Sequence, residues 1–475
     1  MAGKSSFRGC FIIFLILILP SMALASGNWT WVRTDPSPGN WSSGSNWSGG
    51  SGIYPDDPDE TAIFNNPSGV GGPIQNLSMS NGLGRLIFNY SGWTVYVQDP
   101  LKINSISNYS YNAIYSYGTG TNLIYPAIEF LAGSGQNIYT GTGSTLAIAG
   151  GFTGSYAPTI SSVNPTSTDT GAVRLQAASD VSGVFYIRQG TLLVAANNAL
   201  GSSASTVNIG GDEYVANNAN ARLLTDAANV TVTKNIAVRT YTDHEVNATL
   251  GGQQTTGSSS FTGTISLGRT TSFTAASGGP VSFTNTISGN GGVTKIGAGT
   301  VTFSGTGSYL GTTTVSQGTL AFGANNVLGS GPLTVNGATL SMGSYTDSVG
   351  TVTLENSGQI TGNGTLTSTG NFEMKSGSVS VNLAGTSANL YKTTAGTVTL
   401  SGTGTYGGST IISQGTLACG ASNVLGPGLL DVNGGTLSLG SNTDSVGAIW
   451  ISCRHGLQFA EDRNRPTHAY GNEHI

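Results

Sequence analysis

Residues 299–350 read GTVTFSGTGSYLGTTTVSQGTLAFGANNVLGSGPLTVNGATLSMGSYTDSVG, and residues 396–447 repeat this stretch as GTVTLSGTGTYGGSTIISQGTLACGASNVLGPGLLDVNGGTLSLGSNTDSVG. The two segments align without a gap at an offset of 97 residues, and 38 of their 52 positions are identical. A weaker third copy begins at Gln189 and keeps the same 11-residue step between two of its glycines. Self-similarity at a fixed period indicates duplication of a structural unit.

Apolar residues alternate with Thr, Ser or Ala inside short segments of both copies. A period of two predicts β-strands that bury one face. Turns rich in Gly, Asn and Ser-Gly end these strands after about three to five residues. The side chains expected to face the core are Val301, Phe303, Leu320, Leu333, Val335 and Leu340 in the first copy, and Val398, Leu400, Leu417, Leu430, Val432 and Leu437 in the second.

The fold expected from this pattern is all-β. A strand of so few residues cannot bury its apolar face alone, so successive coils must stack in parallel ladders. We therefore predict a right-handed parallel β-helix, or β-solenoid, with about 11–13 coils of ~20–24 residues each in residues 181–450. A β-sandwich array is the alternative, because sandwiches also consist of short alternating strands. The ungapped period favours the solenoid, since 97 added residues extend a stack of coils but disrupt a closed sandwich.

The first 25 residues have the organisation of a secretory signal peptide. Lys4 and Arg8 precede an apolar run over residues 11–19, and small residues stand before a cleavage site after Ala25. The apolar run is too short to cross the ~30 Å of membrane hydrocarbon as a helix. We expect a protein that is secreted or displayed on a bacterial cell surface, and a mature chain with no membrane span.

Composition divides the mature chain into four regions. Residues 26–100 hold five of the six tryptophans and predict a Trp-rich N-terminal β cap over the unpaired edge of the first coil. Residues 101–180 predict an irregular β-solenoid, and residues 181–450 predict the repeat β-solenoid. Residues 451–475 form an atypical polar tail with three of the four histidines. This tail is either the product of a shifted reading frame or a truncated gene, which predicts no packing of Trp450 or Phe459 on the last coil, or a short polar cap.

Three runs, residues 294–305, 309–315 and 317–320, recur within residues 392–417. Their lysine, Gly-rich turn, Ser-Gly, Tyr and Gly-Thr-Leu, in this order, resemble the autotransporter-associated β-strand repeat, the passenger-associated repeat of exported bacterial surface proteins. The opening segment 39–64 is similar to the start of such proteins. The resemblance implies an extended passenger β-helix with a structural or adhesive role outside the cell. Members usually also carry a C-terminal outer-membrane β-barrel, and no segment of this sequence resembles one.

The low content of charged residues argues against nucleic acid as a partner of the protein. Only 8% of residues are charged and the net charge is −5, so a nucleic-acid-binding face, which needs concentrated basic residues, is not expected. Rows of Thr, Ser and Asn instead suit a glycan or another surface receptor. The candidate sugar-stacking residues are Trp29, Trp31, Trp41 and Trp47, whose flat indole faces suit pyranose rings. Packing inside the cap is the alternative for these tryptophans. The sequence indicates no particular oligomeric state.

No catalytic, cofactor-binding or metal-binding residue is assigned. The sequence contains no Gly-x-Ser-x-Gly, His-Glu-x-x-His or P-loop pattern. Asp347 and Asp444, repeated in Thr-Asp-Ser-Val-Gly, are expected to bond nearby backbone N–H groups. The sequence therefore favours a structural or adhesive protein over an enzyme. A polysaccharide-lyase-like β-helix enzyme is the alternative, and it would need aligned carboxylates and a basic residue.

The mature chain retains two cysteines, Cys419 and Cys453, which are too few for a disulfide framework. Cys419 replaces Phe322 of the first copy. We therefore expect Cys419 to be a buried thiol that forms no disulfide with Cys453.

Overall fold

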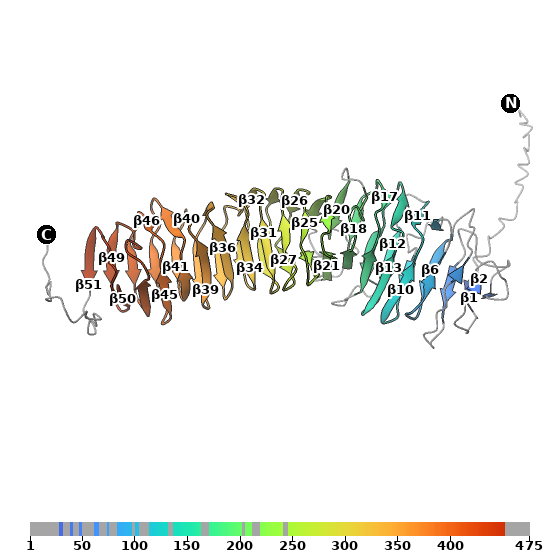
Figure 1. Ribbon diagram of the computed structural model, residues 1–475, viewed down its shortest axis with the longest axis horizontal. Helices are drawn as coiled ribbons and strands as arrows, with labels where there is room; N and C mark the ends of the chain where they lie inside the picture. Colours follow the sequence, from blue (N-terminus) through green and yellow to red (C-terminus); the bar gives the residue numbers. More distant parts are fainter. Residues whose placement is uncertain are drawn as a thin grey trace, which may run out of the picture.

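The computed structural model describes residues 28–31, 39–40, 47–49, 61–65, 74–75, 83–96, 100–103, 114–131, 136–162, 171–201, 205–210, 219–240 and 246–451. Among these residues the only regular elements are β-strands, which stack in parallel sheets into a β-solenoid of about 15 turns. Figure 1 shows one elongated rod whose strands lie across its long axis, from β1 (Asn28–Trp31) to β51 (Ala448–Ile451). The parallel β-solenoid expected from the sequence is therefore confirmed.

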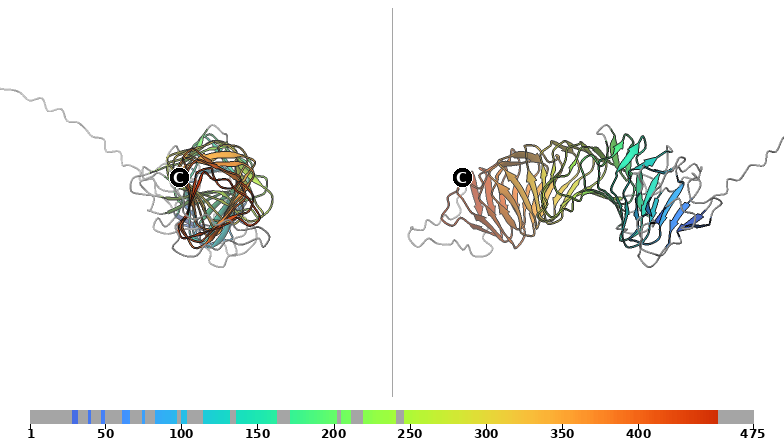
Figure 2. Two further views of the ribbon diagram at one scale, coloured as in Figure 1. Left: turned by 90° about the vertical axis from the view of Figure 1, so that its left-hand side faces the viewer. Right: turned by 45° about the vertical axis from the view of Figure 1, so that its right-hand side comes forward.

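The coils contribute strands to three faces of the rod, and the view along its axis in Figure 2 shows the coils superposed. The first face is one open ladder that ends with the pair β2 and β5 on one side and the pair β49 and β51 on the other. Its strands are β2 (Gly39–Asn40), β5 (Ile74–Gln75), β7 (Thr94–Val95), β10 (Gly120–Ile124), β13 (Ser144–Ile148), β16 (Ala172–Leu175), β19 (Gly190–Val194), β21 (Ala219–Thr225), β24 (Val246–Gly252), β27 (Thr271–Ala275), β30 (Val293–Ile296), β33 (Thr313–Val315), β35 (Leu333–Asn336), β38 (Val352–Glu355), β41 (Phe372–Met374), β44 (Leu390–Lys392), β47 (Thr410–Ile412), β49 (Leu429–Val432) and β51.

The second face consists of a thirteen-stranded sheet followed by a four-stranded sheet. The larger sheet contains β3 (Trp47–Gly49), β1, β4 (Thr61–Phe64), β6 (Arg85–Phe88), β9 (Ile114–Ser116), β12 (Asn137–Thr140), β15 (Thr159–Ser162), β18 (Phe185–Ile187), β20 (Thr206–Ile209), β23 (Asn235–Val238), β26 (Ile265–Leu267), β29 (Ile287–Gly289) and β32 (Gly307–Tyr309). The smaller one contains β37 (Thr346–Val349), β40 (Thr365–Ser368), β43 (Asn382–Gly385) and β46 (Gly404–Tyr406).

The third face consists of a four-stranded sheet followed by an eleven-stranded sheet. The first contains β8 (Leu101–Ile103), β11 (Ile128–Phe130), β14 (Phe152–Gly154) and β17 (Asp180–Val181). The second contains β22 (Thr231–Val232), β25 (Ser259–Phe261), β28 (Val281–Phe283), β31 (Thr300–Phe303), β34 (Thr319–Phe322), β36 (Thr339–Gly343), β39 (Gly358–Gly362), β42 (Gly377–Val379), β45 (Thr397–Leu400), β48 (Thr416–Cys419) and β50 (Thr436–Ser438).

Three loops take the place of a strand, at residues 197–201, 325–329 and 422–426. Each holds an asparagine with positive φ, such as Asn326 at 55°, and two buried apolar side chains after it. Asparagine tolerates this left-handed conformation better than most residues. The first of these loops lies on the third face, whereas the other two lie on the second face. We call them the strand-replacing loops.

The length of the coils varies along the rod. On the first face, residues in register are 31 positions apart at Leu192 and Leu223, but 19 apart at Leu430 and Ile449. Twelve successive strand pairings separate Leu192 from Ile449, in agreement with the predicted number of coils. The predicted coil length of ~20–24 residues is therefore exceeded at the start of this region and not reached in several later coils, and most residues of the 31-residue coil lie outside its strands.

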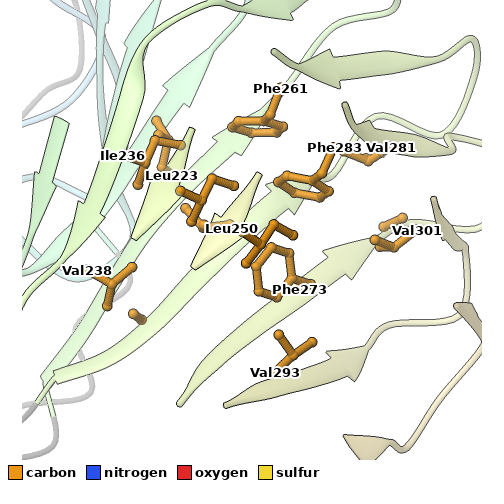
Figure 3. Packing of buried hydrophobic residues seen from close by; sticks show 14 of the residues in the cluster. Leu223, Ile236, Val238, Leu250, Phe261, Phe273, Val281, Phe283, Val293 and Val301 are labelled. Carbon is orange, nitrogen blue, oxygen red and sulfur yellow. The ribbon is translucent and has the colours of Figure 1, made fainter. Parts of the chain in front are cut away.

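The core follows the alternation of the repeats. Of the twelve side chains predicted to face inward, eleven are at most 8% exposed. The twelfth, Leu437, packs against the core but is only partly buried, since β50 is the last strand described in its sheet. Aromatic side chains of successive coils also pack on one another (Figure 3): the rings of Phe261 and Phe283 are 4.7 Å apart at 12°. Cys419 is buried and forms no disulfide, as predicted.

Both ends of the rod have distinct features. Near the N-terminus, β3 pairs antiparallel with β1, which places Trp31 opposite Trp47. On its other side β1 pairs in parallel with β4, and β4 pairs in parallel with β6. At the other end Trp450 lies in β51, the last described strand, and its side chain is 65% exposed. The predicted signal peptide, residues 1–25, and tail residues 452–475 lie outside the described residues. The origin of the tail and the domain boundaries stay predictions.

Candidate functional site

The lysine that the two repeat copies share lies in the core instead of on the surface. Lys295 in β30 is fully buried. Its Nζ donates hydrogen bonds to the carbonyl oxygens of Ile296 at 2.8 Å, Gly297 at 2.7 Å and Gln317 at 3.0 Å. Three acceptors match the three N–H groups of an ammonium. Burial lowers the pKa of Lys295 to about 8.

Lys392 in β44 repeats this arrangement. Its Nζ donates to the carbonyl oxygens of Thr394 and, at 3.0 Å, of Gln414. Burial lowers the pKa of Lys392 as well. Gln317 and Gln414 belong to the coil that follows each lysine, so each ammonium joins two successive coils. The role supported for both lysines is structural.

Asp347 in β37 closes a strand-replacing loop. Its Oδ2 accepts a hydrogen bond from the N–H of Leu328 at 2.9 Å, and its Oδ1 accepts one from the N–H of Ser348 at 2.7 Å. The predicted bonding to a nearby backbone N–H is therefore confirmed, and the bond to Leu328 extends it to the preceding coil. Burial raises the pKa of Asp347 to about 6, although the backbone N–H groups act in the opposite direction.

Titratable groups do not converge in the described part of the chain. No group of three or more His, Cys, Asp or Glu side chains there is placed to hold a metal ion. Ion pairs such as Lys375 to Glu355 at 2.8 Å lie at the surface. Burial raises the pKa of the Cys419 thiol to about 11, which keeps it protonated at neutral pH. None of the described residues forms a helix long and apolar enough to cross a membrane.

Hydroxyl side chains form a column along the outside of the first face. They point outward because their neighbours in each strand point inward: Val293 and Lys295, on either side of Thr294, are fully buried. Neighbouring strands are about 4.8 Å apart, so the hydroxyls repeat at that spacing. In register, the column consists of Thr249, Ser272, Thr294, Thr314, Thr334 and Thr353.

Two tryptophans near the N-terminus, Trp47 and Trp93, contribute packing to the core. Trp47 is 5% exposed, and its ring lies 5.7 Å from that of Phe64. Trp93 is 2% exposed and packs on the same phenylalanine at 5.0 Å. Trp47 therefore occupies the core, as the packing alternative requires, because a covered indole offers no flat face to a sugar.

The side chains of the other three candidate tryptophans lie outside the described residues. Trp29 and Trp31 lie in β1, but their side chains are outside the described residues, as is the whole of Trp41. Sugar stacking by these three residues stays a prediction.

Tyrosines supply the exposed aromatic surface of the early coils. Ten of the 18 tyrosines fall between residues 83 and 187. The sequence shows this concentration, but the irregular repeat of residues 101–180 gave no register from which to place the tyrosines on one face. On the second face, the rings of Tyr115 and Tyr117 are 5.5 Å apart at 7°, and those of Tyr115 and Tyr139 are 5.3 Å apart at 21°. Tyr117 is 39% exposed and Tyr90 is 38% exposed.

We call Tyr90, Tyr115, Tyr117 and Tyr139 the tyrosine patch. A second pair, Tyr96 and Tyr125, lies beyond strands β7 and β10 of the first face, with the two rings 4.3 Å apart. Tyr125 is 47% exposed.

Comparison with known proteins identifies the repeat. Residues 293–322 and 390–418 match the family described as passenger-associated-transport-repeat. These segments run from β30 through β34 and from β44 through β48, and they contain Lys295 and Lys392. The chain thus carries the passenger repeat that its sequence resembles. Neither the curated proteins nor the solved structures gave a match.

Proposed function

We propose that this protein is exported and displayed on a bacterial cell surface, where it serves as a passenger-like structural and adhesive rod without enzymatic activity. The observation that carries the proposal is the passenger repeat built into one continuous ladder of coils. A ladder of this kind gives length from a simple sequence, because each coil needs only its two neighbours for burial and hydrogen bonding.

The surface chemistry supports adhesion over catalysis. The first face presents a column of hydroxyl groups, and only 8% of all residues are charged. Neutral hydroxyl and aromatic side chains suit contacts with a glycan or with the surface of another cell. The two most distinctive buried charges, Lys295 and Asp347, bond to backbone groups in the core, where no substrate reaches them.

Display is tested by producing the full chain in a bacterial host and treating intact cells with a protease that cannot enter them. The expected result is digestion of the protein on intact cells. A Leu17→Arg variant, which puts a charge in the apolar run of the predicted signal peptide, should remain inside and be protected. Protection of the unchanged protein in intact cells would overturn the proposed display.

Adhesion and catalysis are separated by incubating the purified mature chain with plant and bacterial polysaccharides. Saturable retention without release of shorter sugars supports the adhesive role. Release of shorter sugars that grows with time and with protein concentration would overturn it in favour of a carbohydrate-active enzyme.

A further inference from the structure

Strand alternation turns the side chains of Tyr115 and Tyr139 to the outside of the early coils. In β9, Ile114 and Ser116 are fully buried, so Tyr115 between them points outward. In β12, Ile138 and Thr140 are fully buried, so Tyr139 points outward as well. Register places Tyr139 directly opposite Tyr115 in the next coil. The phenol rings therefore follow the long axis of the rod.

The rings of Tyr115, Tyr117 and Tyr139 stack on one another. Tyr115 stacks between Tyr117, which follows it on the same coil, and Tyr139 on the next coil. Tyr90 lies on the preceding coil, where a side chain at Gly118 would come within 2.5 Å of the Tyr90 backbone. Tyr90 and Tyr117, both exposed, therefore follow the paired strands β6 and β9 on adjacent coils. Stacked rings lose little conformational freedom when a partner binds.

We propose that the tyrosine patch is a docking surface for a linear polysaccharide that lies along the axis of the solenoid. This inference rests on the proposed adhesive function and names its partner. A tyrosine offers an apolar ring and a hydroxyl group together, which match the C–H faces and the hydroxyl groups of a sugar ring. The rings repeat from coil to coil at about 4.8 Å, so an extended polymer of repeating units fits the patch.

Charge on this face agrees with a neutral partner. Between β6 and β18, the charged residues that the structure describes on the second face are Arg85 and Arg188, at opposite ends of that stretch. Nucleic acid would need a concentrated row of basic side chains. Binding through uncharged rings is expected to change little with salt, because screening acts on charges.

The test uses the purified mature chain and a panel of cellulose, xylan, mannan, chitin and pectate. We expect at least one neutral polysaccharide to bind in a salt-insensitive manner. The double variant Tyr90→Ala with Tyr117→Ala should bind it about tenfold more weakly, the loss expected when two stacking contacts are removed. Tyr125→Ala, which removes an exposed tyrosine from outside the patch, is the matched control and should bind like the unchanged protein.

Three results obtained with a polysaccharide that binds would overturn the inference. These are unchanged affinity of a folded double variant, an equal loss in the Tyr125→Ala control, and salt-sensitive binding of pectate alone. Failure of every polysaccharide to bind would also overturn it. The proposed function then still stands if protease treatment finds the protein on intact cells, and falls separately if it does not.

A second measurement avoids dependence on folding of the variant. Tetranitromethane nitrates accessible tyrosines, and mass spectrometry locates the modified rings. The bound polysaccharide should protect Tyr90 and Tyr117 from nitration while Tyr125 reacts as before. Equal protection of all three tyrosines, or of none, would count against the patch.

Discussion

The two repeat copies place the same five residues, Thr-Asp-Ser-Val-Gly, in different surroundings. Asp347 of the first copy is 4% exposed and lies in β37, which pairs with β40 of the next coil. Asp444 of the second copy is only partly buried and lies in no strand. The five residues are identical, so the difference comes from their neighbours: Asn442 stands where the first copy has Tyr345, and no strand is described after β46 in the sheet that β37 begins.

The hydrogen bonds within each copy are nevertheless the same. Asp444 accepts bonds from the N–H groups of Val424 at 2.8 Å and Leu425 at 3.1 Å, the partners equivalent to the loop of the first copy. In the core of the first copy, the hydroxyl groups of Tyr309 and Thr313 form a hydrogen bond of 2.6 Å. The equivalent hydroxyl groups of Tyr406 and Thr410 in the second copy form one of 2.7 Å. Each copy therefore forms the same hydrogen bonds. We expect the burial of each site to determine how much these bonds contribute to the free energy of unfolding.

The largest effect is expected where a core leucine has a following coil. Leu340→Ala should lower the free energy of unfolding by about 3 kcal/mol, because it opens a cavity at a fully buried site. The equivalent Leu437→Ala should cost about 1 kcal/mol, since Leu437 is already partly exposed. Urea denaturation followed by circular dichroism measures both. Equal losses would show that the following coil does not determine burial.

The loop-closing aspartates should give the next largest effect. Asp347→Ala leaves the N–H of Leu328 without its acceptor in a buried loop, which costs about 2 kcal/mol. Asp444→Ala should cost about half as much, because water reaches the partly buried site of the second copy. The same denaturation measurement decides between them, and a larger loss in Asp444→Ala would contradict the comparison.

The duplicated region was predictable because period two and a fixed repeat constrain it jointly. Val301 and Leu417 could be assigned to the core from the sequence, since a register shift of one would expose every apolar residue. Coil length was less predictable, because turn lengths vary without disturbing the alternation. The bond from Asp347 to Leu328 was not predictable either, since it depends on which residues of two coils come into register.

The candidate binding surface was the hardest part to predict. Trp47 has the side chain of a sugar-stacking residue, but Phe64 covers it, and only the packed structure reveals that contact. Tyr115 and Tyr139 are 24 residues apart in the sequence and become neighbours only through the register of β9 and β12. Stacked outward rings leave no periodic signal when the repeat is irregular.

Acid should stabilise the first copy through Asp347. Its pKa is about 6 in the folded protein and near 3.8 when unfolded, so the folded state binds more protons between these values. The contribution of Asp347 to stability is therefore most favourable below the unfolded pKa and is lost as the pH rises through 6. Between pH 7 and pH 5 the gain is about 1 kcal/mol.

Asp347→Asn removes this titration and keeps a side-chain acceptor. The variant should lack the acid gain of the unchanged protein, as measured by denaturation at the two pH values. Asp444→Asn is the matched variant of the second copy. If Asp347→Asn keeps the full acid gain, another group causes it.

The smallest difference should appear in thiol reactivity, with Cys453→Ser as the background so that Cys419 is the single cysteine of the mature chain. Cys419 and Phe322 occupy equivalent positions and are equally buried at 7%. A thiol reagent at pH 8 should label native Cys419 at least about a hundredfold more slowly than the unfolded chain, because burial limits access and holds its pKa near 11. The comparison protein carries Cys419→Ser and Phe322→Cys, which moves the thiol into the first copy. Its labelling should be slower still by a few fold, since more coils follow β34 than β48 and local opening is less frequent in the interior of a stack. Faster labelling in the first copy would show that the end of the rod opens no more readily than its interior.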